Sequence, residues 1–280
     1  MTIGEALKNH RNIEIELLLA GVLNKPKEFI FLHPEFILTS KHLNILSKYI
    51  KRREKGEPVA YVLGYKDFMG LRFKVNKDVL IPRPETEGMV EKVIERLKDL
   101  RFKNSEIKIL DVGTGSGCVA VSLAKILPGK IQDSRFIIHA SDISKKALKV
   151  AKANAKAHGV KIRFIHSDIL QNMRMSYDVI VANLPYGWNE WKNNSSVETV
   201  GLKFEPKQAL FTGEKGLLII RKLLRSISSL KHKPKYIFLE FDPRQKARLL
   251  KLIKKSLPKS HTHFYKDINK FWRFCEIISY

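Results

Sequence analysis

The chain has 280 residues, of which 52 are Lys or Arg and 28 are Asp or Glu, so its formal net charge is +24. This length predicts about two domains, and a composition of 44% hydrophobic and 29% charged residues excludes a chain that is disordered or fibrous throughout. Its two cysteines, Cys118 and Cys275, exclude a disulfide framework and a four-cysteine zinc site.

Charge and hydropathy also bound the location and the partners. No apolar run approaches the roughly 18 residues of a membrane span, and the segment MTIGEALKNHRNIEIE has acids where a secretory signal has an uncharged core, so we expect a cytoplasmic protein. A charge of +24 predicts weak attraction to nucleic acid or ribosomes. The alternative is that the basic clusters at 145–156 and 244–255 are solvated faces of amphipathic helices, because apolar residues recur within them at helical spacing.

The first part of the chain has the pattern of a small helical domain, which we assign to residues 1–56 as a substrate-recognition domain. Thr2 and Glu5 have the spacing of a capping box, and a second helix is expected from Ser40, its serine cap, to Lys55. Gly56-Glu57-Pro58 then ends the helical pattern.

The next residues indicate a linker, which we place at 57–87. Residues 59–82 are rich in β-forming side chains and contain turn glycines at Gly64 and Gly70, so we expect a β-hairpin there.

From residue 107 onward strands and helices alternate, which predicts an α/β domain over 88–280 with a mainly parallel sheet and helices on both faces. Expected strands are 108–112, 136–140, 161–166, 177–182, 236–241, 263–265 and 274–278, and expected helices are 118–127, 145–157, 216–230 and 243–257.

A glycine-rich loop, Asp111-Val-Gly113-Thr-Gly115-Ser-Gly117, joins the first of these strands to its helix. Such a loop lets the backbone and the helix N-terminus approach a ligand closely. A dinucleotide fingerprint would have its third glycine where Cys118 stands. The spacing G-x-G-x-G after a strand-end acid instead resembles class I S-adenosylmethionine-dependent methyltransferases.

The second and third strands also end in acids. Asp142 is placed to accept the two ribose hydroxyls of a cofactor, and Asp168 to contact the adenine amine. Each aspartate alone would equally suit a helix cap or a turn. Together with the glycine loop, they predict a binding crevice for S-adenosylmethionine at the carboxyl ends of the strands.

The fourth strand ends in Asn183-Leu184-Pro185-Tyr186. The Asn183 side-chain oxygen and the following backbone carbonyl can accept the two N–H bonds of a planar –NH2 group, which aims its nitrogen at an electrophilic methyl group. Pro185 fixes the turn, and Tyr186 can stack on an amide or a base. An Asn-x-Pro turn is common by itself, but after a cofactor loop it indicates an amino-methyltransferase.

Such motifs occur in methyltransferases of DNA adenine, rRNA bases and protein glutamine, and three further segments help to separate them. Those segments are 57–64 (EPVAYVLG), 80–87 (LIPRPETE) and 205–217 (EPKQALFTGEKGL). With them the chain resembles, over nearly its whole length, the release factor glutamine methyltransferases, the protein-(glutamine-N5) methyltransferase family.

The resemblance implies a Rossmann-like class I methyltransferase domain with a mostly parallel seven-stranded sheet, and a small N-terminal helical domain joined to it by a β-hairpin. It implies methyl transfer from S-adenosylmethionine to the glutamine amide of the Gly-Gly-Gln motif in peptide chain release factors. The implied catalytic residues are Asn183, Pro185 and Tyr186, and the implied substrate clamp is Asn183, Leu184, Pro185 and Tyr186. The implied cofactor residues are Gly113, Thr114, Gly115, Ser116, Gly117, Asp142, Asp168, Ile169 and Asn183; no metal site is expected.

The sequence departs from the family pattern, which makes it a divergent member. Leu184 replaces the first proline of Asn-Pro-Pro-Tyr, and Asn-Leu-Pro-Tyr also occurs in rRNA adenine dimethyltransferases. The alternative function is therefore methylation of the exocyclic amine of an RNA or DNA base. Phe241 follows Glu240 where a glycine is expected, and Lys270 stands where a glycine is usual.

The roles of several other side chains are left open by the sequence. Trp188 and Trp191 form either a substrate lid or a loop anchor, and Arg83 faces either the substrate entrance or the helical domain. His261 and His263 share a strand face without a third ligand nearby in sequence, which favours a solvated edge.

Overall fold

The computed structural model describes residues 1–280 except 11–13, 100–105, 132–133, 189–200 and 280. The chain divides into two compact units. One consists of Met1–Tyr65 with Ser196–Phe204, and the other of Lys66–Ser195 with Glu205–Tyr280. Among the helices that are described, none is long and apolar enough to cross a membrane.

The first unit is helical. Its elements are α1 (Ile3–Asn9), α2 (Ile15–Leu23), α3 (Lys27–Leu32), α4 (Ser40–Glu54), α5 (Val59–Leu63) and the 3-10 helix η2 (Leu202–Phe204). The predicted capping box is confirmed: the Thr2 side chain accepts from the Glu5 amide at 3.2 Å, and Glu5 accepts from the Thr2 amide at 2.8 Å. Ile3, Leu18 and Ile30 are fully buried in this unit's own core.

Two local predictions in this unit are wrong. The cap of α4 is Thr39, whose hydroxyl accepts from the His42 amide at 3.2 Å, while Ser40 is the first helical residue. The expected β-rich stretch begins with α5 instead, because Val62 packs into the helical core. The Arg52 guanidinium donates to the carbonyls of Tyr61 and Val62, two of the groups that a helix end leaves unpaired.

The expected hairpin follows α5. Strands β1 (Tyr65–Phe68) and β2 (Leu71–Lys74) form a two-stranded sheet, and Gly70 between them adopts φ +71°. A positive φ is the backbone conformation that glycine adopts at no steric cost.

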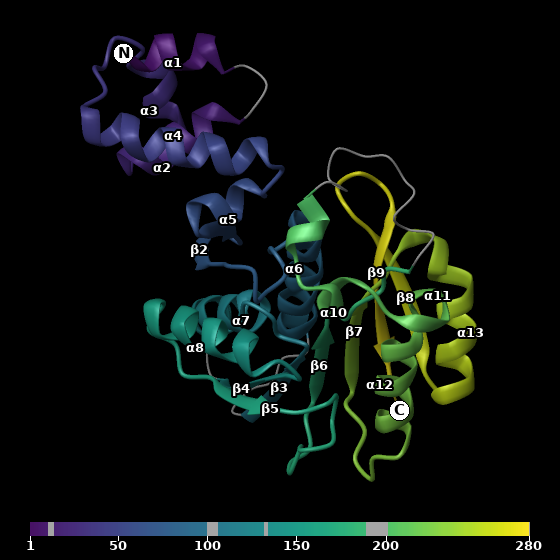
Figure 1. Ribbon diagram of the computed structural model, residues 1–280. Helices are drawn as coiled ribbons and strands as arrows, with labels where there is room; N and C mark the ends of the chain where they lie inside the picture. Colours follow the sequence, from purple (N-terminus) through teal and green to yellow (C-terminus); the bar gives the residue numbers. More distant parts are fainter. Residues whose placement is uncertain (11–13, 100–105, 132–133, 189–200, 280) are drawn as a thin grey trace. The chain divides into compact units, whose positions relative to one another are not determined.

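The second unit contains the predicted alternation of strands and helices (Figure 1). Its strands are β3 (Glu106–Val112), β4 (Arg135–Asp142), β5 (Arg163–His166), β6 (Val179–Ala182), β7 (Tyr236–Glu240), β8 (His261–Lys266) and β9 (Trp272–Ile278). Its helices are α6 (Pro84–Asp99), α7 (Cys118–Lys130), α8 (Lys145–Ala157), α10 (Lys207–Leu210), α11 (Gly213–Gly216), α12 (Leu218–Ser228), η3 (Pro243–Gln245) and α13 (Lys246–Ser256).

These strands form a seven-stranded sheet in the order β5-β4-β3-β6-β7-β9-β8. Strand β9 is antiparallel to both of its neighbours, β7 and β8, and the other neighbouring strands pair in parallel. The predicted class I methyltransferase fold is therefore confirmed. The chain moves from β3 outward through β4 to β5 and then returns to the other side of β3 at β6. Such a reversal is the point at which open α/β sheets bind ligands.

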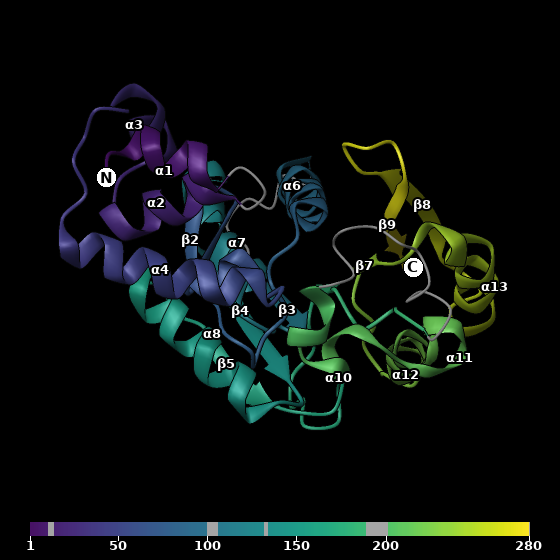
Figure 2. The same ribbon diagram turned by 45° about the horizontal axis from the view of Figure 1, so that its top comes forward.

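Alternating side chains build a separate core on each face of the sheet, since successive strand residues point to opposite faces. On β7, Phe238 joins the cluster beneath α6 and α7, whereas Ile237 and Leu239 join the one beneath α12 and α13. In Figures 1 and 2, α7 and α8 lie on one side of the sheet and α12 and α13 on the other.

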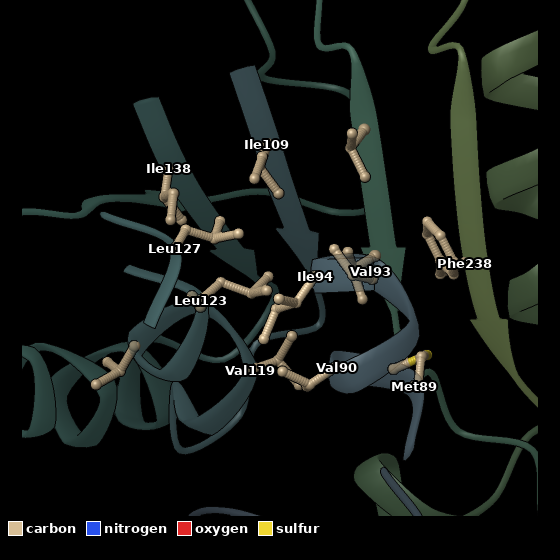
Figure 3. Close-up of a cluster of buried hydrophobic side chains, with 14 of the residues drawn as sticks. Met89, Val90, Val93, Ile94, Ile109, Val119, Leu123, Leu127, Ile138 and Phe238 are labelled. Carbon is tan, nitrogen blue, oxygen red and sulfur yellow. The ribbon is translucent and has the colours of Figure 1, made fainter. Parts of the chain in front are cut away.

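Helix α6 has no counterpart among the predicted elements. It packs Met89, Val90, Val93 and Ile94 against the sheet and α7, as Figure 3 shows. Their spacing of one, three and four residues is itself the pattern of an amphipathic helix. The linker predicted for 57–87 includes the first four residues of α6, which begins at Pro84.

Candidate active site

The glycine loop between β3 and α7 is held in a tight curve. Gly113, Gly115 and Gly117 all have positive φ, at +75°, +55° and +82°. The amides of Gly113 and Thr114 both donate to the Ser141 carbonyl at 2.9 Å, which ties the loop to the end of β4. A Cβ on Gly117 would lie 3.0 Å from the Ala151 Cβ on α8, so this glycine is also needed for packing.

A cavity of about 310 Å³ opens beside this loop, at the carboxyl ends of β3, β4, β5 and β6. Parallel strands bring these ends together, because Val112 pairs with Ser141 on one side and with Ala182 on the other. The predicted site residues that line the cavity are Gly113, Gly115, Asp142, Asp168, Ile169, Asn183, Leu184 and Pro185.

Asp142 is fixed in the wall of the cavity by backbone donors. Its two carboxylate oxygens accept from the amides of Gly115 and Ser144, at 2.9 and 2.8 Å. Each oxygen keeps a further lone pair for a ligand hydroxyl. Burial raises the pKa of Asp142 above its ordinary value, and the two backbone hydrogen bonds oppose that rise.

Asp168 has a partner that the sequence did not suggest. The Lys222 ammonium on α12 forms an ion pair with one of its carboxylate oxygens. The two residues are 54 positions apart, so the pair is revealed only by the tertiary structure.

Three predicted cofactor residues support the loop instead of lining the cavity. Thr114 and Ser116 are buried, and neither they nor Gly117 are among the described residues of the cavity wall. The Thr114 hydroxyl donates to Asp111 at 2.6 Å, and the Ser116 carbonyl accepts from the Asn154 side chain at 2.8 Å. Burial raises the pKa of Asp111 to about 7.

The side-chain amide nitrogen of Asn183 is hydrogen-bonded beside the cavity. Its Nδ2 donates to the Thr86 hydroxyl at 3.0 Å, and that hydroxyl donates to Glu240 at 2.7 Å. The Tyr186 hydroxyl donates to the other Glu240 oxygen at 3.0 Å. The sequence contained a signal for this network, since Thr86 belongs to the segment LIPRPETE and Glu240 ends a strand, but neither was predicted as a site residue.

The backbone after the clamp is equally constrained. Gln245 donates through Nε2 to the Tyr186 carbonyl at 2.8 Å and to the Lys215 carbonyl at 2.9 Å. Gly216, at φ +84°, lies so close that a Cβ there would overlap the Tyr186 carbonyl. The Gly187 amide donates to the Leu210 carbonyl at 2.8 Å. The segment EPKQALFTGEKGL thus forms a support for the clamp.

Arg83 forms an ion pair within this unit. Its guanidinium donates to the buried Glu205 at 2.5 Å, and the second Glu205 oxygen accepts from the Ile81 amide at 3.0 Å. Glu205 therefore joins two of the segments on which the family resemblance rests.

The unusual Lys270 occupies a backbone position that suits glycine. Its φ is +65°, in a turn closed by Asp267, which accepts from the Phe271 amide and the Arg273 guanidinium, both at 3.0 Å. The turn therefore keeps its shape despite the strain of a left-handed lysine.

The cysteine, histidine and tryptophan side chains noted in the sequence are not among the described residues of the cavity wall. Cys118 is buried and burial raises its pKa to about 12, so the thiol packs and is not a nucleophile at neutral pH. Within the described ranges no group of three metal-ligating side chains occurs, and His261 and His263 are exposed. The Arg244 guanidinium lies 4.5 Å from the Trp188 ring centre, while Trp191 is outside the described residues.

Comparison with known proteins agrees with this geometry. The family model "Methyltransferase small domain" matches residues 93–231, and "PrmC N-terminal domain" matches residues 5–64. The chain is 38% identical over 243 residues to the release factor glutamine methyltransferase of Coxiella burnetii, covering 86% of this chain and 82% of that one. It is 31% identical over 258 residues to the protein of the same name from Bacillus cereus, covering 91% and 88%.

Solved structures share the fold at low sequence identity. The hMettl16 catalytic domain, in complex with MAT2A 3'UTR hairpin 6, is similar with a TM-score of 0.58 at 16% identity, covering 85% of this chain and 91% of that one. The T. thermophilus 16S rRNA N2 G1207 methyltransferase, in complex with AdoMet and guanosine, has a TM-score of 0.52 at 14% identity, covering 77% and 50%.

Proposed function

The chain belongs to the release factor glutamine methyltransferase family, and from this premise we propose its substrate and the roles of its site residues. The proposed reaction transfers a methyl group from S-adenosylmethionine to the side-chain amide nitrogen of the glutamine in the Gly-Gly-Gln motif of a peptide chain release factor. The observation that carries this proposal is the Asn183 amide, whose nitrogen is held by Thr86 beside a cavity lined by Asn183 itself.

The residues of the cavity suit S-adenosylmethionine. Gly113 and Gly115 leave room for close approach, and Asp142 has acceptor capacity for two hydroxyls. Ile143 and Ile169 offer apolar surface for a purine ring, and Asp168 can accept from its amine. S-adenosylmethionine, when bound, supplies a methyl group that is already electrophilic.

The chain has to hold a neutral amide nitrogen in the right place. The free oxygen of Asn183 and the Leu184 carbonyl accept the two N–H bonds of the glutamine amide, and Tyr186 covers its planar face. These hydrogen bonds strengthen as the nitrogen gains positive charge, so they favour the transition state over the ground state. No side chain has to remove a proton before transfer.

We also propose separate roles for the three parts of the chain. Residues 1–56 recognise the release factor, residues 57–87 join the two domains, and residues 88–280 bind the cofactor and catalyse methyl transfer. The match of residues 5–64 to a family-specific N-terminal model supports the first assignment. Phe31, Leu32 and Ile37, which are 56–73% exposed, offer apolar contact area for a protein partner. Because translation termination takes place in the cytoplasm, we place the enzyme there.

The decisive experiment offers three separate acceptors to the enzyme with methyl-labelled S-adenosylmethionine. The acceptors are the release factor from the same source, its Gly-Gly-Gln variant with the glutamine changed to alanine, and total RNA. We expect label on the parental factor alone. Label on RNA alone would overturn the protein substrate and assign the same clamp to a base amine.

A second measurement tests the cofactor site. Asp142→Ala removes both carboxylate oxygens from the cavity wall, so we expect at least a tenfold weaker affinity for S-adenosylmethionine by calorimetry, about 1.4 kcal/mol. Asp67→Ala, which removes an exposed carboxylate outside the described cavity wall, is the control. Unchanged affinity in Asp142→Ala would remove this aspartate from the cofactor site.

A further inference from the structure

The side-chain amide of Asn183 has two chemically different ends, and only the oxygen can accept an N–H bond from the substrate. Rotating the amide by half a turn would present an –NH2 group to another –NH2 group, which cannot hydrogen-bond productively. The two orientations have nearly the same shape, so packing alone does not select between them. A hydrogen-bonding partner has to do so.

Thr86 is that partner. Its hydroxyl lies 3.0 Å from Asn183 Nδ2 and 2.7 Å from Glu240 Oε2. A hydroxyl carries a single hydrogen, and here that hydrogen is donated to the carboxylate. Toward Asn183 the Thr86 oxygen can therefore only accept, which requires the nitrogen end of the amide. Thr86 is 2% exposed, so water does not compete for this position.

Glu240 sets the direction of the whole chain of hydrogen bonds. Its second oxygen accepts from the Tyr186 hydroxyl at 3.0 Å, so one buried carboxylate orients donors from two sides. An ionised carboxylate can only accept. Were it replaced by an amide, which also donates, the Thr86 hydroxyl would be free to turn toward Asn183.

The charge state of Glu240 depends on its surroundings. Burial and the neighbouring Glu85 raise its pKa, whereas the hydrogen bonds from Thr86 and Tyr186 and the positive charge of Arg273 lower it. Cys118 is a further titratable group near it. The direction of the hydrogen bonds is therefore best defined on the alkaline side of the titration of Glu240, where the carboxylate is ionised and can only accept.

The partners stand on rigid elements. Thr86 lies in the first turn of α6, a helix anchored on the sheet by Met89, Val90 and Val93 (Figure 3), and Glu240 ends the buried strand β7. The positions of Thr86 and Glu240 are consequently set by the packing of α6 and β7.

We propose that Thr86 and Glu240 are positioning residues that fix the amide of Asn183 with its oxygen toward the acceptor nitrogen. This role explains the threonine in the segment LIPRPETE, and it rests on the proposed function for the identity of the acceptor. Neither residue belongs to the described cavity wall.

The test compares Thr86→Val, which keeps the shape and removes the hydroxyl, with Thr86→Ser, which keeps the hydroxyl. At about pH 8.5, we expect Thr86→Val to lower kcat roughly 10- to 100-fold, with cofactor affinity within about twofold of the parent. Thr86→Ser should restore kcat to within about threefold. Glu240→Gln should lower kcat at least as much as Thr86→Val does, because Glu240 also holds the Tyr186 hydroxyl. Adding Thr86→Val to Glu240→Gln should lower kcat little further, because the hydroxyl of Thr86 acts on Asn183 only when Glu240 orients it.

A second readout needs no acceptor and no turnover. In protein labelled with 15N-asparagine, the side-chain protons of Asn183 are identified by their absence in Asn183→Ala. One of them should exchange slowly with solvent in the parent and in Thr86→Ser, and rapidly in Thr86→Val. Thermal melts show whether each variant is folded.

The outcomes separate this inference from the proposed function. A parental enzyme that labels RNA but not the release factor would overturn the substrate, while the exchange experiment would still test the role of Thr86. The positioning role is overturned if Thr86→Val keeps kcat within about threefold of the parent. It is also overturned if, in Thr86→Ser, the Asn183 side-chain protons exchange as fast as in Thr86→Val and kcat is as low.

Discussion

At the residue scale, the polar groups at the site are held by partners distant in sequence. Thr86 and Glu240 are 154 positions apart in the chain, with Asn183 between them in sequence. Their side chains nevertheless form consecutive hydrogen bonds, from Asn183 to Thr86 and from Thr86 to Glu240. Buried polar groups carry a large penalty when unpaired, so such a network is either fully satisfied or destabilising. Single substitutions within it should therefore have large effects.

Asn183→Ala removes the oxygen proposed to accept the glutamine N–H bond. We expect a loss of about 2–4 kcal/mol of transition-state stabilisation, roughly 30- to 900-fold in kcat/KM, by analogy with other positioned polar partners. Steady-state methylation of the release factor measures this, with thermal melts as the control for folding. A variant whose turnover stays within a few-fold of the parent would mean that the clamp is wrongly assigned.

Asp111 should make stability fall with rising pH. Its pKa is raised by burial from an ordinary 3.8 to about 7, so the folded protein binds its proton more tightly than the unfolded chain. This favourable contribution is complete below about pH 4 and is lost as pH rises through 7. Relative to Asp111→Asn, the parent should lose unfolding free energy between about pH 5 and 7.5 in denaturant titrations. Parallel stability profiles of the parent and Asp111→Asn would contradict this origin. So would an equal flattening of the profile by the exposed control Asp67→Asn, which keeps Asp111.

At the element scale, the turn before α12 buttresses the loop after β6. Glu214 and Lys215 both have left-handed backbone conformations, with φ of +57° and +54°, and Gly216 follows at +84°. These residues delay the start of the helix from the predicted Gly216 to Leu218. This conformation places the Lys215 carbonyl where it and the Tyr186 carbonyl both accept hydrogen bonds from the Gln245 side-chain nitrogen.

Gly216→Ala tests this buttress against a matched glycine. Gly159 has a similar positive φ of +66° but open space around its Cβ position, so Gly159→Ala should cost only the backbone strain, about 1–2 kcal/mol. Gly216→Ala adds an overlap with the Tyr186 carbonyl, so its melting temperature should fall several degrees further. Equal losses in the two variants would show that the close approach does not matter.

At the scale of the whole molecule, part of the net charge of +24 lies on an exposed helix face. Lys145, Lys149, Lys152 and Lys156 are all exposed on α8, opposite the face that packs on the sheet. They do not line the described cavity. The charge therefore predicts general attraction to polyanions, separate from the reaction.

RNA capture should accordingly depend steeply on salt and should not track methyl transfer. Because binding releases counterions, we expect RNA retention to fall by at least tenfold between about 50 and 200 mM salt. Lys149→Glu with Lys152→Glu should reduce the slope and leave methylation of the release factor unchanged. A matching loss of methylation would place α8 in the recognition of the protein substrate.

The sequence by itself determined the fold class and the position of the cavity. Short, largely apolar strands such as 179–182 and 236–240 and the repeated βα order dictate a mainly parallel sheet, because each strand buries both of its faces beneath helices. Gly113, Gly115 and Asp142 were predictable because a strand-end glycine loop and acid have local signals. The placement of Asn183 beside them follows from the strand order, since parallel strands align their carboxyl ends.

The tertiary structure alone decided which side chains meet. Nothing local distinguishes the Thr86 hydroxyl from an ordinary first-turn threonine, or connects Glu205 with Arg83 and Lys222 with Asp168. For the same reason, the sequence did not reveal that Thr114 and Ser116, both predicted as cofactor residues, are buried and do not belong to the described cavity wall. Spacing along a strand or helix specifies which face a residue occupies, whereas hydrogen bonds between distant segments depend on how whole elements pack.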